Sequence, residues 1–232
     1  MKQRLQISVI LTMVLAMSVC NVFAENKVFT ESGEILDGEV WDLVDIYNDD
    51  TVVDMSGGSV DYISTFDSST LNMSGGLAEV GAFETSTINI SGGSLFSGAN
   101  AYDGGTVNLL DCDYSIDLRV YESGTGNMFG GTVEYLIAGD FGTLDLYGGV
   151  VTDSLGAWES SIVNVYGYDL DKTTIGGIYG YGQVSGFFMD DSAFTIDFST
   201  PQTYSHVNLV PESGTLILLG FGVIIMKRKA RR

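Results

Sequence analysis

Apolar and polar positions alternate in a short phrase that returns at regular intervals through the middle of the chain. The second and fourth positions of each copy are apolar in nearly every case: Val53/Met55, Leu71/Met73, Ile88/Ile90, Val107/Leu109, Leu144/Leu146 and Val163/Val165. The position between them is always Asn or Asp: Asp54, Asn72, Asn89, Asn108, Asn127, Asp145 and Asn164. Alternation with a period of two predicts a short β-strand with one buried face. We expect the Asn/Asp row on the outer face to form a hydrogen-bonded ladder.

The spacing of these copies predicts how the strands are arranged. A glycine pair or its variant follows each strand, and its first residue stands at positions 57, 75, 92, 111, 130, 148 and 167. A repeat of about 18 residues is typical of stacked supersecondary units. The glycines supply the positive φ that a tight corner needs. We therefore predict an all-β fold, a β-solenoid of about seven coils with a period of about 18 residues, over residues 51–168.

A second strand is expected after each corner. Its predicted inward pairs are Val60/Tyr62, Ala78/Val80, Tyr114/Ile116 and Val133/Tyr135. An aromatic residue then precedes an acidic one at the next corner, and these aromatic residues are Phe66, Phe83, Tyr102, Tyr121 and Trp158. Packing at the corner is the favoured interpretation of this aromatic row, and contact with sugar rings is the alternative.

The segments that flank the repeats have their own patterns. Residues 1–24 have a basic start, an apolar run and small residues before Glu25, which predicts a signal peptide handled by the Sec translocon and signal peptidase. Residues 25–50 are expected to form an N-terminal entry coil or cap, and residues 169–209 a C-terminal β cap and linker. Cys112, the one cysteine after residue 24, lies at a corner. We expect a buried thiol there, with an intermolecular bridge as the alternative.

The charge of the body excludes several classes of partner. Residues 25–209 hold 29 acidic residues and only three basic ones, Lys27, Arg119 and Lys172, for a net charge of −26. Nucleic acids and anionic membrane surfaces need clustered Lys and Arg, so neither is expected as a partner. Loose calcium binding by Asp61, Asp67, Asp103 or Glu122 is an alternative to a plain solvated surface, but the Gly-Gly-x-Gly-x-Asp runs of calcium-binding solenoids are missing.

Catalytic chemistry has little support in the sequence. His206 is the only histidine, so neither a zinc site nor a Ser-His-Asp arrangement has the residues it needs around it. We predict no catalytic residue, no metal site and no cofactor.

The end of the chain carries the most specific motif. Val210-Pro211-Glu212-Ser213 is followed by an apolar run from Thr215 to Met226 and then by the basic residues Lys227, Arg228, Lys229, Arg231 and Arg232. This order resembles the PEP-CTERM sorting tail of exported bacterial proteins, with Ser213 where the usual motif has a second proline. The resemblance covers residues 210–232 and implies that an exosortase-type membrane transpeptidase processes the tail. It also implies that the body reaches the cell surface or the extracellular matrix.

The length of the apolar run suggests how long the tail stays in the membrane. Twelve residues in a helix span about 18 Å, which is short of a hydrocarbon core of about 30 Å. We expect a short hydrophobic helix that holds the protein transiently in the inner membrane, with its basic terminus inside. A permanent anchor is the alternative.

Two classes of function fit these observations. The first is an exported, non-enzymatic structural or adhesive protein of the surface or of an exopolysaccharide matrix. The second is a polysaccharide-binding or polysaccharide-degrading β-helix protein. Polysaccharide lyases place several basic residues on one face and build a cleft from long loops, whereas these coils stay within 17–19 residues. We therefore favour the first.

Overall fold

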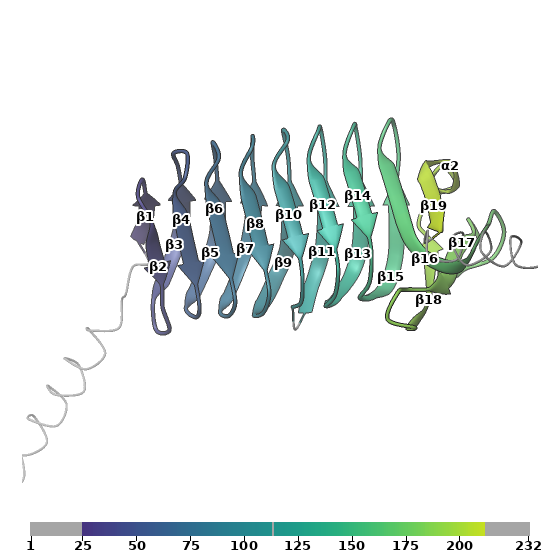
Figure 1. The fold of residues 1–232 in the computed structure, drawn as a ribbon, viewed down its shortest axis with the longest axis horizontal. Helices are drawn as coiled ribbons and strands as arrows, with labels where there is room; N and C mark the ends of the chain where they lie inside the picture. The colour runs from purple at the N-terminus through teal and green to yellow at the C-terminus, as the bar shows by residue number, and fades with distance from the viewer. Residues whose placement is uncertain (1–24, 113, 212–232) are drawn as a thin grey trace, which may run out of the picture.

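The computed structural model describes residues 25–112 and 114–211. The predicted signal peptide and the apolar and basic parts of the tail lie outside the described residues. The described chain winds into coils stacked along one axis, with its first and last strands at opposite ends (Figure 1). The prediction of a nearly all-β solenoid with about seven turns is confirmed. The one helix among the described residues, α2, spans only Thr203–His206.

Each coil contributes one strand to each of two parallel sheets. Sheet A contains the longer strands: β1 (Glu25–Phe29), β3 (Val40–Ile46), β5 (Ser59–Thr65), β7 (Leu77–Ala82), β9 (Ser94–Ala101), β11 (Tyr114–Val120), β13 (Thr132–Ala138) and β15 (Val150–Ala157). Sheet B contains β2 (Gly33–Ile35), β4 (Val52–Met55), β6 (Thr70–Met73), β8 (Thr87–Ile90), β10 (Thr106–Leu109), β12 (Thr125–Met128), β14 (Thr143–Leu146), β16 (Ile162–Thr173) and β19 (Val207–Pro211). Neighbours pair in parallel, as β5 does with β7 and β6 with β8. The pairing begins at β1 and β2, so the predicted entry coil is already part of both sheets.

The strands of sheet B bury one face in the core and form a hydrogen-bonded row on the other. Their apolar pairs are buried between the sheets, as Leu71/Met73 and Ile88/Ile90 show. On the outer face, the amide of each coil donates to the preceding coil: Asn72 to Asp54 at 2.9 Å, Asn89 to Asn72 at 2.9 Å, Asn108 to Asn89 at 2.8 Å, Asn127 to Asn108 at 2.8 Å and Asn164 to Asp145 at 2.7 Å. The predicted ladder is confirmed. It is interrupted once, because Asp145 has no side-chain amide to donate to Asn127.

The strands of sheet A contain bulges that change which side chains point inward. Register shifts follow Val60 in the pairing of β5 with β7 and Val133 in the pairing of β13 with β15. A bulge inserts an extra residue, so the alternation with period two does not continue past it. The prediction that Tyr62 and Tyr135 point into the core is therefore wrong, since both are half-exposed. The prediction for Tyr114 is wrong for another reason: the inward position at the start of β11 belongs to Ser115, in register with the buried Leu95, and Tyr114 is exposed. Ile63, Leu118 and Leu136 are buried further along these strands.

The glycine corners require glycine for two separate reasons. A Cβ on the first glycine of a pair would press into the backbone of the preceding coil, as at Gly92, where it would lie 2.6 Å from the Ser74 carbonyl oxygen. The second glycine has a positive φ, for example +84° at Gly93. Cys112 occupies the corner that lacks the pair and is only 4% exposed, with its Sγ 3.8 Å from the Thr132 carbonyl oxygen. The prediction of a buried thiol is confirmed.

The array ends in a β cap whose last strand rejoins sheet B. Strands β17 (Gln183–Phe187) and β18 (Ala193–Phe198) form an antiparallel hairpin beside the extended β16, and β18 pairs in parallel with β15. Strand β19 then pairs in parallel with β16, and Asn208 donates to Asn164 at 3.1 Å. The sequence pattern ended the repeats at residue 168 and placed a linker before residue 210. The structure adds one further strand of sheet B in that linker, beyond the cap.

A lysine near each end of the described array contacts neighbouring segments of the chain. Near the start, the Lys27 ammonium lies 4.6 Å from the centre of the Phe29 ring and 4.8 Å from that of Trp41. In the cap, Lys172 Nζ donates to the carbonyl oxygens of Tyr204 at 3.0 Å and Val207 at 2.6 Å. Both cations therefore hold neighbouring segments together, and Arg119 is the one basic residue in the middle of the described array.

Candidate functional site

The predicted aromatic row lies along one edge of the solenoid, at the corner that follows each strand of sheet A. Ring centroids are 4.7 Å apart for Tyr47 and Phe66, 5.2 Å for Phe66 and Phe83, 5.2 Å for Phe83 and Tyr102, and 5.7 Å for Tyr102 and Tyr121. Their planes differ by only 8° to 16°. The faces of these half-buried rings are therefore covered by one another, which leaves mainly their edges to solvent. The arrangement fits corner packing better than a platform on which sugar rings stack.

Trp158 belongs to the same row but joins it across a coil that has no aromatic residue at the row's position. Gly139 stands at the aromatic place of that coil, and a Cβ there would lie 2.9 Å from both Trp158 Nε1 and Tyr121 Cδ1. The Tyr121 and Trp158 rings lean over Gly139, with centroids 6.3 Å apart and planes at 50°. The glycine thus leaves room for the large indole of Trp158, and the row continues past a coil that contributes no ring to it.

A second aromatic row, which the sequence pattern did not single out, follows the repeated phrase in sheet B: Phe129 and Tyr147 lie just after β12 and β14, and Tyr166 lies within β16. Phe129 and Tyr147 stack with centroids 4.7 Å apart, and Tyr147 and Tyr166 with centroids 4.3 Å apart. Each ring immediately precedes a glycine corner in the repeated phrase. The signal was therefore present in the sequence, at a position that holds Ser56, Ser74, Ser91 and Leu110 in the earlier coils.

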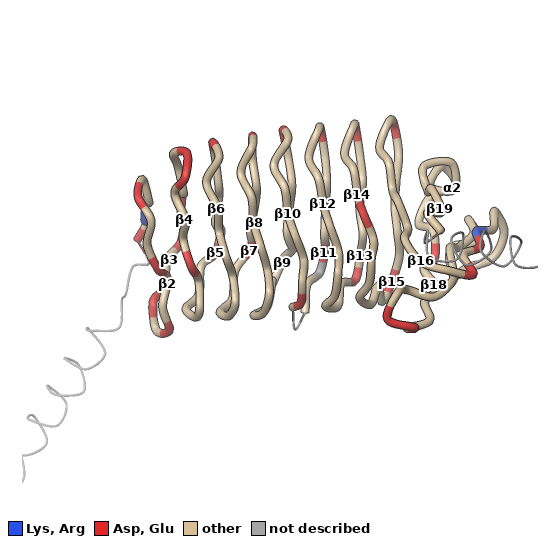
Figure 2. Tube along the Cα trace, viewed as in Figure 1, with Lys and Arg blue, Asp and Glu red and all other residues tan. Residues whose placement is uncertain are grey.

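The acidic partner of each aromatic residue forms a column at the same edge. The residues are Asp67, Glu84, Asp103, Glu122, Asp140 and Glu159, each with a φ between 50° and 61°. Their red segments recur at the upper ends of successive coils in Figure 2. Some carboxylates accept backbone N–H groups from the preceding coil, as Glu84 Oε2 does from Asp67 at 2.9 Å. A hydrogen bond with the Asp103 carboxyl raises the pKa of Glu122, and one with Asp140 raises the pKa of Glu159.

No metal centre is found in the described part of the chain, and the one histidine contacts the backbone. Within residues 25–112 and 114–211, no group of three His, Cys, Asp or Glu side chains is placed to hold a metal ion. His206 lies in α2, and its Nδ1 is 2.9 Å from the Ser161 carbonyl oxygen, so the ring contacts the backbone of the last full coil.

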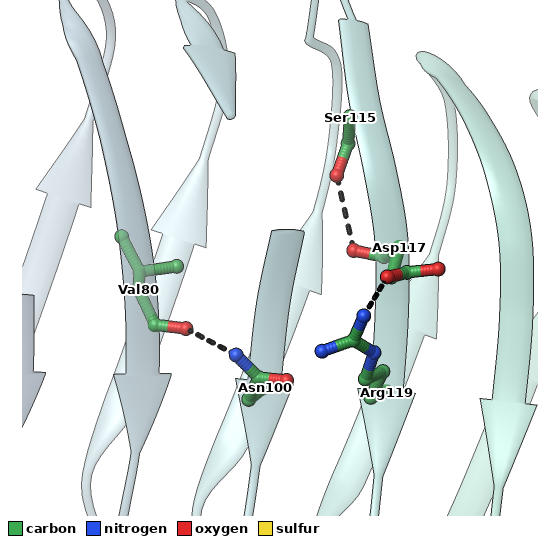
Figure 3. A network of polar contacts seen from close by, with 5 residues as sticks. All are labelled: Val80, Asn100, Ser115, Asp117 and Arg119. Atoms are coloured by element: carbon green, nitrogen blue, oxygen red, sulfur yellow. Dashed lines mark hydrogen bonds and ion pairs between the residues drawn. The ribbon is translucent and has the colours of Figure 1, made fainter. Parts of the chain in front are cut away.

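One polar cluster stands apart from these repeating rows, on the outer face of sheet A. Asn100 of β9 and Arg119 of β11 are paired in register, and the residue in register on β7 is Gly81. The Arg119 guanidinium forms an ion pair with Asp117, whose side chain is 4% exposed. Ser115, on the inner face in register with the buried Leu95, donates from Oγ to the Asp117 carbonyl oxygen at 3.0 Å (Figure 3).

Asn100 is the unusual member of this cluster. The residue is 3% exposed, and its Nδ2 donates to the Val80 carbonyl oxygen at 3.4 Å. Its Oδ1 is the one buried side-chain oxygen or nitrogen of the described residues without a hydrogen-bond partner. Figure 3 shows this oxygen on the side of the strand that faces Arg119. A buried acceptor without a donor costs about 1–3 kcal/mol, so this position is a feature that needs an explanation.

Charge and burial together set the titration of this cluster. Burial raises the pKa of the Asp117 carboxyl, and the Arg119 charge offsets only part of that rise. Burial likewise raises the pKa of Tyr62 to about 12, with smaller contributions from Tyr102 and Glu79. The tyrosine hydroxyls therefore stay protonated at neutral pH and can donate hydrogen bonds.

No family model, curated protein or solved structure matches this chain. The interpretation of the site therefore depends on its own geometry. The sequence singled out Arg119 only as a rare base. The structure places it beside two buried polar residues, Asn100 and Asp117.

The sorting motif is described only in its first half. Val210 and Pro211 are the last residues of β19, in register with Tyr166 and Gly167. Glu212, Ser213 and the basic residues from Lys227 to Arg232 lie outside the described residues. In the part of the chain that is described, no helix has the length and apolar character required to span a bilayer.

Proposed function

We propose that this chain is an exported, non-enzymatic structural or adhesive protein of the cell surface or of an exopolysaccharide-rich extracellular matrix. The observation that carries the proposal is the continuity of the two parallel sheets. Strands pair in parallel from β1 to the cap, with bulges confined to sheet A, and the corners between them stay short. Such a body presents two long outer faces and suits a scaffold or adhesive better than an enzyme built around a cleft.

Charge and the ends of the chain support the same proposal. The net charge of −26 over residues 25–209 favours a soluble, self-repelling body. Residues 1–24 would direct export through the Sec translocon, followed by cleavage by signal peptidase. The tail would hold the protein transiently in the inner membrane until an exosortase-type transpeptidase acts at Val210-Pro211-Glu212-Ser213.

The position of the motif favours processing without damage to the fold. Pro211 is exposed and ends the last strand of sheet B, so cleavage after it would leave both sheets intact. Proline also disfavours helix at the preceding residue, which keeps Val210 extended.

Fractionation of producing cells combined with intact mass tests this proposal. We expect the mature protein at the surface or in the matrix, without residues 1–24 and without the basic residues from Lys227 to Arg232. Replacing Pro211 and Glu212 with Ala should trap the protein in the inner membrane. Mature protein that keeps its basic terminus, or a double variant with an unchanged destination, would contradict the proposed route.

A polysaccharide-binding protein is the second candidate. The polar cluster around Arg119 favours binding over degradation, because it supplies hydrogen-bonding groups but no paired acid and base in a cleft.

A further inference from the structure

The cluster around Asn100 and Arg119 contains a hydrogen-bond acceptor that the described residues leave without a partner. Asn100 Oδ1 is a buried acceptor without a partner among the described residues. The Arg119 guanidinium has five N–H donors, and its ion pair with Asp117 uses the Nη2 end. Since the two residues are in register on adjacent strands, their Cα atoms lie about 4.8 Å apart on the same outer face. An acceptor without a partner therefore stands beside an arginine whose ion pair engages one end of its guanidinium.

The chemistry of these groups specifies the ligand. Asn100 Oδ1 requires a donor, whereas the Arg119 N–H groups require an acceptor. A hydroxyl group provides both functions, because it has one O–H and two lone pairs. A carboxylate or phosphate would satisfy Arg119 alone and would place a second acceptor against the Asn100 oxygen.

The surrounding charge selects against anions in the same way. Asp117 already neutralises Arg119, and its side chain is too buried for solvent to screen the pair fully. The body around the pair is strongly acidic. A neutral molecule therefore enters this field at a lower electrostatic cost than an anion does.

Tyrosines border the cluster on neighbouring coils. Gly81 lies in register with Asn100, and a Cβ at this glycine would collide with the Tyr62 hydroxyl, so that hydroxyl reaches over the neighbouring strand. Tyr102 and Tyr121 are half-buried in the stacked row at the corner that follows Asn100 and Arg119. Their aromatic edges supply an apolar border beside the polar groups.

We propose that this cluster on the outer face of sheet A is a binding subsite for a neutral sugar residue of a polysaccharide. Asn100 Oδ1 accepts a hydrogen bond from one sugar hydroxyl, and Arg119 donates to the oxygen of the same or the adjacent hydroxyl. The Arg119 side chain, 34% exposed, shifts to admit the sugar while Asp117 keeps its charge paired. Tyr62 and Tyr102 border the bound ring.

This inference goes beyond the proposed function, because the subsite would bind sugar wherever the protein resides. Its failure would leave an exported structural rod without a sugar ligand. Conversely, a sugar-binding protein that never leaves the cell would retain the subsite and contradict only the proposed export.

Affinity electrophoresis of the full chain in a sugar-free mild detergent tests the subsite. The gels contain galactomannan, laminarin or dextran as neutral probes and alginate as an anionic probe. We expect retardation by at least one neutral polysaccharide and none by alginate. Asn100→Leu and Arg119→Gln should each weaken the association at least tenfold.

Matched variants separate binding from folding and from non-specific adhesion. Phe129→Leu, in the other aromatic row, should leave the retardation unchanged, and thermal melting should show that every variant is folded. If Asn100→Leu does not fold, Asn100→Ser takes its place. The proposal is overturned if no neutral polysaccharide retards the chain, if both cluster variants bind normally, or if alginate binds through Arg119. If no polysaccharide retards the chain and Asn100→Leu melts at a higher temperature, the Asn100 oxygen binds only a bridging water. That result also overturns the proposal.

Discussion

Single residues at corresponding places in successive coils decide which hydrogen bonds join the coils. An Asn in the outer row of sheet B both donates to the preceding coil and accepts from the next. An Asp can only accept, and this explains why Asp54 begins the row of bonds and why the row restarts at Asp145. Gly139 shows the same sensitivity, because its missing side chain is what allows Trp158 to lean toward Tyr121.

The interrupted row gives a prediction for one substitution. Asp145→Asn should complete the ladder with a bond to Asn127 while keeping the bond from Asn164, and should remove one charge from an acidic body. We expect the free energy of unfolding to rise by about 0.5–1 kcal/mol. Asp145→Ala, which loses the acceptor for Asn164, should lower it by about 1 kcal/mol. Denaturant unfolding of the two variants measures both changes, and a less stable Asp145→Asn would contradict the role given to the row.

At the scale of the strands, the sequence pattern predicted sheet B well and sheet A only in part. Strict alternation in a four-residue strand leaves one arrangement that buries both apolar residues, so Leu144 and Leu146 were placed correctly. Sheet A could not be treated in this way, because bulges break the alternation and turn Tyr62 and Tyr135 outward. The pairing of Asn100 with Arg119 follows a further register shift, between Ser115 and Asp117 of β11, and for this reason the sequence alone did not reveal the cluster.

A proline in the centre of sheet B tests the register of the strands. Leu144 is fully buried, and its strand β14 lies between β12 and β16. Leu144→Pro removes a donor from the sheet and a large side chain from the core, so it should cost about 3–5 kcal/mol. Leu144→Met, which nearly conserves volume, should cost less than about 1.5 kcal/mol. Thermal melting followed by circular dichroism distinguishes these outcomes, and unchanged melting of the proline variant would refute the assigned register.

For the whole molecule, the stacked acidic column makes stability depend on pH. The pKa values of Glu122 and Glu159 are raised in the folded chain, and that of the buried Asp117 is raised as well. A carboxyl whose folded pKa exceeds its unfolded value favours folding when it is protonated. That contribution is fully present below the unfolded pKa and is lost as the pH rises through the folded pKa.

The expected result is a melting temperature that is higher near pH 5 than near pH 8. Added sodium chloride should reduce this difference, because it screens repulsion between exposed carboxylates. Glu122→Gln together with Glu159→Gln should flatten the profile, whereas Asp190→Gln should not, because hydrogen bonds from Ser192 lower the pKa of Asp190. A melting temperature that rises steadily from pH 5 to pH 8 would show that the column does not control the acid response.

The common direction of the amide ladder makes the two ends of the rod chemically unequal. Among the described residues, the outer row of sheet B starts with Glu34 and Asp54, whose carboxylates can only accept. It finishes with Asn208, whose side-chain Oδ1 is also an acceptor. A second molecule stacked end to end would place the Glu34 carboxylate against the Asn208 amide oxygen, and neither group can donate a hydrogen bond to the other. The ladder therefore cannot continue from one molecule to the next. The carboxylate of Glu34 in the first coil, where an amide would donate, disfavours growth of the rod into an endless fibre.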